Sequence, residues 1–112
     1  MSLQSLRTGK ALIVRLAGEF DLHAAHPFKE AVADALALDP GLTHLVIQMQ
    51  QVTFMDSSGV GAILARYRDV KARGGVLAVV GLQPAVRKVF DLSGMGRVIP
   101  VYATEGEALA HL

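Results

Sequence analysis

The residues whose types could most readily take part in chemistry form one run, Asp56-Ser57-Ser58-Gly59, with a further glycine at position 61. A serine in such a run could attack a substrate, cap a helix or accept a phosphate. A nucleophilic serine needs a neighbouring base and often lies in a G-x-S-x-G elbow. Neither Ser57 nor Ser58 has a glycine two positions before it, and the sequence places none of the four histidines beside them. We therefore expect no catalytic residue.

Other groups that could do chemistry are isolated from one another. His23 and His26 lie near the start of a predicted helix and could offer two metal ligands, but no third ligand is close in sequence. The glycines at 59 and 61 are not followed by the lysine of a phosphate-binding loop. The chain has no cysteine, which excludes disulfides, thiol catalysis and thiolate metal sites. We expect a protein that is not an enzyme and that holds no metal and no cofactor.

Composition and charge suit a single domain that spans residues 1–112. The chain is 52% hydrophobic but only 5% aromatic, so its core must be mainly aliphatic. Its 11 basic and 10 acidic residues give a formal net charge of +1, which leaves no electrostatic footprint for nucleic acid or an anionic membrane. The polar segment 1–10 does not resemble a signal peptide, and no apolar run is long enough to span a membrane. We expect a cytoplasmic protein with neither nucleic acid nor membrane as a partner.

Apolar periodicity and turn residues predict the element order β-β-α-β-α-β-α-β-α. The expected strands lie near residues 5–7 and at 11–18, 42–49, 76–80 and 98–101, and the first two form a hairpin through residues 8–10. The expected helices occupy residues 23–38, the segment that Gly74-Gly75 ends, 84–92, and a short stretch after Thr104. Pro27 suits only a first turn, so the regular part of the first helix should begin near it. This order implies an α/β fold with a mixed, mostly parallel open sheet of four to five strands and four to five helices.

The serine run lies where this fold would place a binding site. It follows the strand ending near residue 49 and starts a helix, and partners usually engage open sheets at such carboxyl ends. Asp56, Ser57 or Ser58 could each cap that helix, and capping alone is a common reason for serines there. Gly59 and Gly61 cost about 0.8–1 kcal/mol each relative to alanine, which suggests a flat surface that another protein approaches. A phosphate here would add about −1.5 to −2 charge and act on binding rather than on folding.

The residues around the serine run resemble a known family. The segment 54–61, FMDSSGVG, is similar to the signature of STAS-domain anti-anti-sigma factors. Residues 16–21, LAGEFD, resemble the family's L-x-G-E-L-D motif, and Arg66-Tyr67, Gly74-Gly75 and the segment 84–94 follow in the family's order. The resemblance covers essentially the whole chain. It is stronger to the sporulation (stage II) type of endospore-forming bacteria than to the general-stress type.

The resemblance implies a partner-switching cycle. The unphosphorylated protein, a monomer when free, would bind an anti-sigma factor that is also an ATP-dependent serine kinase, and so release a sigma factor. Phosphorylation of Ser57 would end this association, and a PP2C-type phosphatase would restore it. The same resemblance assigns partner binding to five positions: Asp21, Asp56, Ser58, Gly59 and Gly61. Asp21 could equally serve only as a cap for the helix that follows it.

Three positions depart from the family pattern. Gln48 stands where Asp or Asn is usual, so a hydrogen bond from the shorter side chain to the serine loop is in doubt. Phe20 replaces a usual leucine, and Pro27 is atypical in the first helix.

The alternative function is that of a scaffold or structural STAS protein, such as a stressosome component or the soluble subunit of a lipid transporter. A nucleotide-binding protein is a third possibility, although no loop cradles phosphate.

Overall fold

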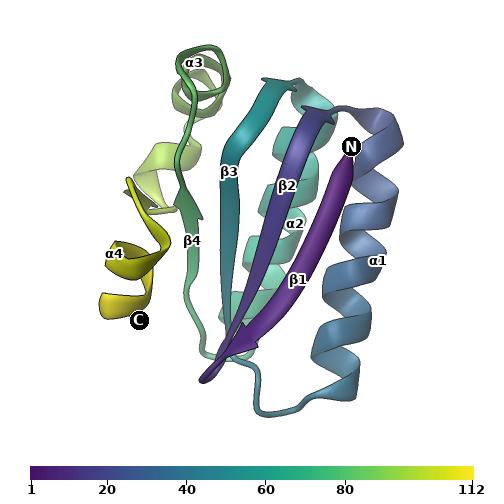
Figure 1. The fold of residues 1–112 in the computed structure, drawn as a ribbon, viewed down its shortest axis with the longest axis vertical. Helices are drawn as coiled ribbons and strands as arrows, with labels where there is room; N and C mark the ends of the chain where they lie inside the picture. The colour runs from purple at the N-terminus through teal and green to yellow at the C-terminus, as the bar shows by residue number, and fades with distance from the viewer.

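A five-stranded sheet organises the computed structural model, which describes residues 1–112 (Figure 1). The elements, in chain order, are β1 (Ser2–Thr8), β2 (Ala11–Phe20), α1 (Leu22–Leu38), β3 (His44–Met55), α2 (Ser57–Ala72), β4 (Leu77–Val80), α3 (Pro84–Leu92), the 3-10 helix η1 (Met95–Arg97), β5 (Val101–Tyr102) and α4 (Glu105–Ala110). The strands lie in the order β1-β2-β3-β4-β5. β1 is antiparallel to β2 and all other pairs are parallel, which confirms the predicted mixed, mostly parallel sheet.

The sheet is buried on both faces, but very unequally. Alternate residues of the central strands, such as Val14 and Ile47, point to one face, where they pack against α1, α2 and α3 in the main core. The residues between them, such as Ile13 and Val46, point to the other face and pack with Ala108 of α4 in a smaller cluster. Figure 1 shows α1 and α2 together along one face, with α4 beside β4. The continuous apolar runs in the sequence follow from this two-sided burial.

Strand β3 is longer than the sequence predicts. We expected it to end at Met49, with a connecting segment up to the serine run, but it continues to Met55. Val52 and Met55 are buried, and residues 51–55 pair with the last residues of β2 across two register irregularities. These irregularities break the strict alternation of apolar and polar residues, so the polar pair Gln50 and Gln51 reads as a loop in the sequence. The serine run therefore follows directly from a sheet strand.

Helix α1 begins earlier than expected. We placed its regular part near Pro27, but the helix starts at Leu22, because the Asp21 side chain accepts a hydrogen bond from the Ala24 amide at 3.1 Å. Pro27 is the sixth helical residue, and it lacks the N–H that would bond the His23 carbonyl. Both residues are exposed, so water can satisfy that carbonyl, and the helix accommodates the proline without ending.

The last strand is shorter and later than predicted. We expected residues 98–101 to form it, but β5 is only Val101–Tyr102. Val98 instead ends η1, with its amide bonded to the Met95 carbonyl at 3.1 Å. The short helix α4 follows as expected: the Thr104 side chain accepts from the Glu107 amide at 3.2 Å, and Glu107 in turn accepts from the Ala103 amide at 3.3 Å.

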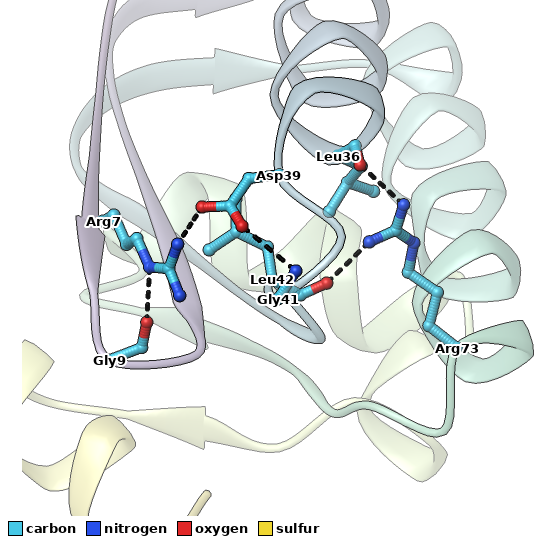
Figure 2. Close-up of polar contacts among 7 residues, drawn as sticks. All are labelled: Arg7, Gly9, Leu36, Asp39, Gly41, Leu42 and Arg73. Atoms are coloured by element: carbon cyan, nitrogen blue, oxygen red, sulfur yellow. Dashed lines mark hydrogen bonds and ion pairs between the residues drawn. The ribbon is translucent and has the colours of Figure 1, made fainter.

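Two arginines fasten the end of the molecule that lies away from the serine run (Figure 2). Arg73, which follows α2, donates to the Leu42 carbonyl at 2.6 Å and to the Leu36 carbonyl at 2.7 Å, and the latter belongs to the last turn of α1. Arg7, near the β1–β2 turn, donates to Asp39 and to the Gly9 carbonyl. These contacts join the β-hairpin, the α1–β3 connection and α2, and they fix the two long helices relative to the sheet.

Candidate functional site

The ends of β2 and β3 bring two aspartates to one edge of the sheet. Phe20 and Met55 are paired in register, and the Asp56 amide donates to the Phe20 carbonyl at 3.4 Å. The next residue on each strand caps a helix: Asp21 caps α1, and Asp56 caps α2. Because both helices begin at the same edge, their positive N-terminal ends point the same way, and each holds a carboxylate.

Asp56, and neither serine, is the cap of α2. Its Oδ1 accepts from the Ser58 amide at 2.9 Å and from the Gly59 amide at 3.4 Å. Ser57 is the first helical residue and is exposed, whereas Ser58 is half-buried. Neither hydroxyl makes a hydrogen bond within the chain, and no histidine or other base is paired with Ser57. The arrangement therefore presents a free hydroxyl on a preformed helix start, which another protein could reach.

The two glycines of α2 differ in what they do. A Cβ on Gly59 would lie 2.6 Å from the Phe20 carbonyl oxygen and 2.7 Å from Met55 Cγ, so the absence of a side chain lets α2 pack closely on the strand ends. A Cβ on Gly61 would meet nothing within 4 Å, and Gly61 is exposed. The fold thus accounts for Gly59 without any partner, whereas Gly61 is a flat surface position that the fold does not require.

Asp21 caps α1 and also lines a hollow on the surface. It lines an open hollow of about 410 Å³, together with Met1, Glu19 and His23 among others. His26 instead pairs with Glu30 at 2.9 Å, so the two histidines of α1 do not act together. No group of three or more metal-ligating side chains is present. Asp21 thus caps α1 and is also accessible at the same edge of the sheet as Ser57.

The exposure of three residues near the site does not follow from their residue type. Leu22 is 70% exposed and Phe54 is 47% exposed, although both are large and apolar. Arg66 of α2 is only 6% exposed, although arginine is mostly an exposed residue type, and it donates from Nε to Asp69 at 2.9 Å. An apolar residue directly after a helix cap and a charged residue at helical spacing from buried positions are the only hints the sequence offers.

Gln48 does not act on the serine loop. Its Nε2 donates to Glu105 at 3.2 Å, and its Oε1 accepts from the Gln50 amide at 2.9 Å. Arg15 donates to both carboxylate oxygens of Glu105, at 3.0 and 2.9 Å. The hydrogen bond from the Arg15 guanidinium holds the pKa of Glu105 below its ordinary value, although partial burial opposes this shift. The longer glutamine therefore helps to attach α4 to the sheet, on the face away from α2.

The mixed five-stranded sheet and its helices have the arrangement of a known domain family. The chain belongs to the STAS domain family, which matches residues 2–108. Within the family it resembles anti-sigma factor antagonists, which are regulatory binding proteins and not enzymes. No helix is both long and apolar enough to cross a lipid bilayer.

Three comparisons carry this assignment. The anti-sigma F factor antagonist of Paenibacillus polymyxa is 38% identical over 101 residues, which cover 90% of this chain and 86% of that protein. The solved structure of the unphosphorylated anti-sigma factor antagonist SpoIIAA superposes with a TM-score of 0.86 at 34% identity, covering 98% of this chain and 95% of that one. The phosphorylated form of Bacillus SpoIIAA gives a TM-score of 0.77 at 33% identity, covering 98% of both chains.

Proposed function

We propose that the chain is an anti-sigma factor antagonist that phosphorylation of Ser57 switches off. Its unphosphorylated form binds an anti-sigma factor and so releases a sigma factor for transcription. The partner is also an ATP-dependent serine kinase, which modifies Ser57, and a PP2C-type phosphatase reverses the modification. We also propose that the protein is monomeric when free, lies in the cytoplasm and acts in sporulation. The observation that carries it is the exposed Ser57 hydroxyl at a helix start that Asp56 already caps.

The hydrogen bonding around Ser57 explains why a phosphate would act on a partner. The amides of Ser58 and Gly59 already donate to Asp56, so a phosphate on Ser57 finds few free donors within its own helix. Asp56 lies beside it, and a second carboxylate, Asp21, caps the adjacent helix. The added charge of about −1.5 to −2 therefore stays on the surface and repels or displaces whatever covers this edge. The fold itself has no contact that the phosphate must break.

Four of the five residues expected to bind the partner can contact it directly, and the fifth, Gly59, is buried. Asp21, Asp56, Ser58 and Gly61 are accessible at the edge of the sheet where α1 and α2 begin, and they can contact the partner directly. Gly59 supports that surface from below, because it allows α2 to lie against the Phe20 carbonyl. The partner is thus expected to approach the helix starts, where the exposed Gly61 lets it come close to the α2 backbone.

Mass spectrometry after incubation with ATP and the anti-sigma factor of the same genome tests this proposal. We expect one phosphate, on Ser57, in the wild type and in Ser58→Ala, and none in Ser57→Ala. Modification of Ser58 in place of Ser57, or no modification at all, would contradict the switch. Size-exclusion chromatography of the free chain is a second check, because a megadalton assembly would instead favour the scaffold type of STAS protein.

A further inference from the structure

A groove runs between α1 and α2, starting at the edge of the sheet where Ser57 lies. It has a volume of about 280 Å³, and its walls include Leu22, His26 and Lys29 from α1 and Ala62, Ala65 and Arg66 from α2. The α1 residues recur at spacings of four and three, and the two later α2 residues lie three and four positions beyond Ala62, so each set forms one stripe along its helix. We refer to it as the α1–α2 groove.

The groove is continuous with the proposed phosphorylation site. Leu22 directly follows the cap Asp21, and Ala62 lies one helical turn beyond Ser58. Gly61 is exposed and has open space where a Cβ would lie, so the surface stays flat between the serine and the groove. A partner that covers Ser57 therefore meets no side chain at position 61 on its way to the groove.

The chemistry of the groove is apolar with positive charge and no negative charge. Leu22 is 70% exposed at its upper end. No carboxylate lines the groove, whereas Lys29 and Arg66 both do, and Lys29 has no ion-pair partner. An exposed leucine beside alanines favours an apolar side chain. The unpaired Lys29, together with the part of the Arg66 guanidinium that Asp69 does not bind, favours a carboxylate next to it.

The positive charge of Arg66 is held in place by the fold, because the side chain is buried and bonded to a neighbour on α2. Its side chain is only 8% exposed, and its Nε donates to Asp69 at 2.9 Å. The two terminal nitrogens have no acceptor within the chain, and they must reach solvent, because no buried side-chain nitrogen or oxygen lacks a hydrogen-bond partner. A carboxylate that entered the groove could accept from these nitrogens, in the paired geometry that guanidinium groups favour.

From these observations we propose that the α1–α2 groove anchors the anti-sigma partner by taking one of its apolar side chains with an adjacent carboxylate. This inference rests on the proposed function, because the occupant is the same partner that Ser57 controls. The groove would supply affinity that does not depend on Ser57, and the phosphate would act at its upper end. The partner segment should therefore be acidic and apolar.

Calorimetric titration of the anti-sigma factor of the same genome tests the groove with exposed residues only. We expect Leu22→Ala and Lys29→Glu each to weaken binding about tenfold. The matched controls are Leu38→Ala, an 86% exposed leucine at the other end of α1, and Lys10→Glu in the β1–β2 turn. Both controls should bind within about twofold of the wild type, because neither residue lines the groove.

The possible outcomes separate the groove from the switch. Groove variants that bind like the wild type, while Ser57→Asp binds poorly, would overturn the groove and leave the switch intact. Weakened groove variants together with a tightly binding Ser57→Asp would support the groove and contradict the switch. Sedimentation of the free chain covers the remaining occupant: a dimer that Leu22→Ala converts to monomer would assign the groove to a second copy and overturn the proposal.

Discussion

The two glycines of α2 provide a matched pair of substitutions whose effects on stability should have opposite signs. In Gly59→Ala, the new methyl would lie 2.6 Å from the Phe20 carbonyl oxygen and 2.7 Å from Met55 Cγ, where ordinary contacts are 3.4–4 Å. The carbonyl belongs to the backbone at the end of β2, so it cannot move aside like a flexible side chain. Gly61→Ala places the same methyl on the same helix in open space.

The magnitudes follow from two opposing terms. Overpacking a buried position costs about 1–3 kcal/mol, and alanine regains about 0.8–1 kcal/mol of helix propensity over glycine. Because the closest contact of Gly59→Ala is with backbone, its steric cost should lie in the upper part of that range, for a net loss of about 1–2 kcal/mol. Gly61→Ala gains only the propensity and should be more stable than the wild type by up to about 1 kcal/mol.

Urea unfolding followed by far-UV circular dichroism measures both changes in one assay. For a domain of this size, a change of 1 kcal/mol moves the melting temperature by roughly 4 °C, so thermal melts should give the same order. A Gly59→Ala variant as stable as Gly61→Ala would refute the close packing of α2 on the strand ends. Gly61→Ala should also bind the anti-sigma partner several-fold more weakly, which a purely structural glycine would not do.

Three further predictions concern the contacts that support the site. Arg73→Ala leaves two main-chain carbonyls without their donors and should lower the free energy of unfolding by about 1–3 kcal/mol in urea melts, with unchanged partner binding because Arg73 lies at the other end of α2. Asp56→Ala removes a helix cap and should cost about 0.5–2 kcal/mol, whereas Asp56→Ser should keep most of the stability; equal losses in the two variants would argue against the capping role. Glu105→Gln should be less stable than the wild type at neutral pH. Because the folded-state pKa of Glu105 is lowered by Arg15, this difference should narrow as the pH falls below the ordinary value of 4.5 and vanish below the lowered pKa; a difference that persists in acid would contradict the ion pair.

The sequence predicts the element order because its signals are local. Thr8-Gly9-Lys10 turns a hairpin, Gly74-Gly75 ends α2, and Thr104 with Glu107 starts α4, each through bonds between near neighbours. The errors arise where a distant contact decides the outcome. Residues 50–55 read as a connection, but their pairing with the end of β2 makes them a strand. The sequence predicts Val98 as a strand residue, but its amide donates to the Met95 carbonyl and so ends η1.

The candidate site could be located from the sequence, but the role of each residue within it could not. Three adjacent residues were equally good caps for α2, and only the backbone geometry selects Asp56 and leaves Ser57 free. Gly59 and Gly61 are indistinguishable in a sequence, since what separates them is the Phe20 carbonyl, which lies far away along the chain. Arg66 is charged, a type that is mostly exposed in proteins, yet it is buried in the wall of the α1–α2 groove.

In the proposed switch, the chemical state of Ser57 decides whether the partner binds. Calorimetric titration of the anti-sigma factor of the same genome with the unmodified, phosphorylated, Ser57→Ala and Ser57→Asp forms tests it most directly. We predict that the unmodified chain and Ser57→Ala bind alike, and that phosphorylation weakens binding by about a hundredfold or more, while all four forms melt within a few degrees of one another. A phosphorylated chain that binds as tightly as the unmodified one would refute the Ser57 switch.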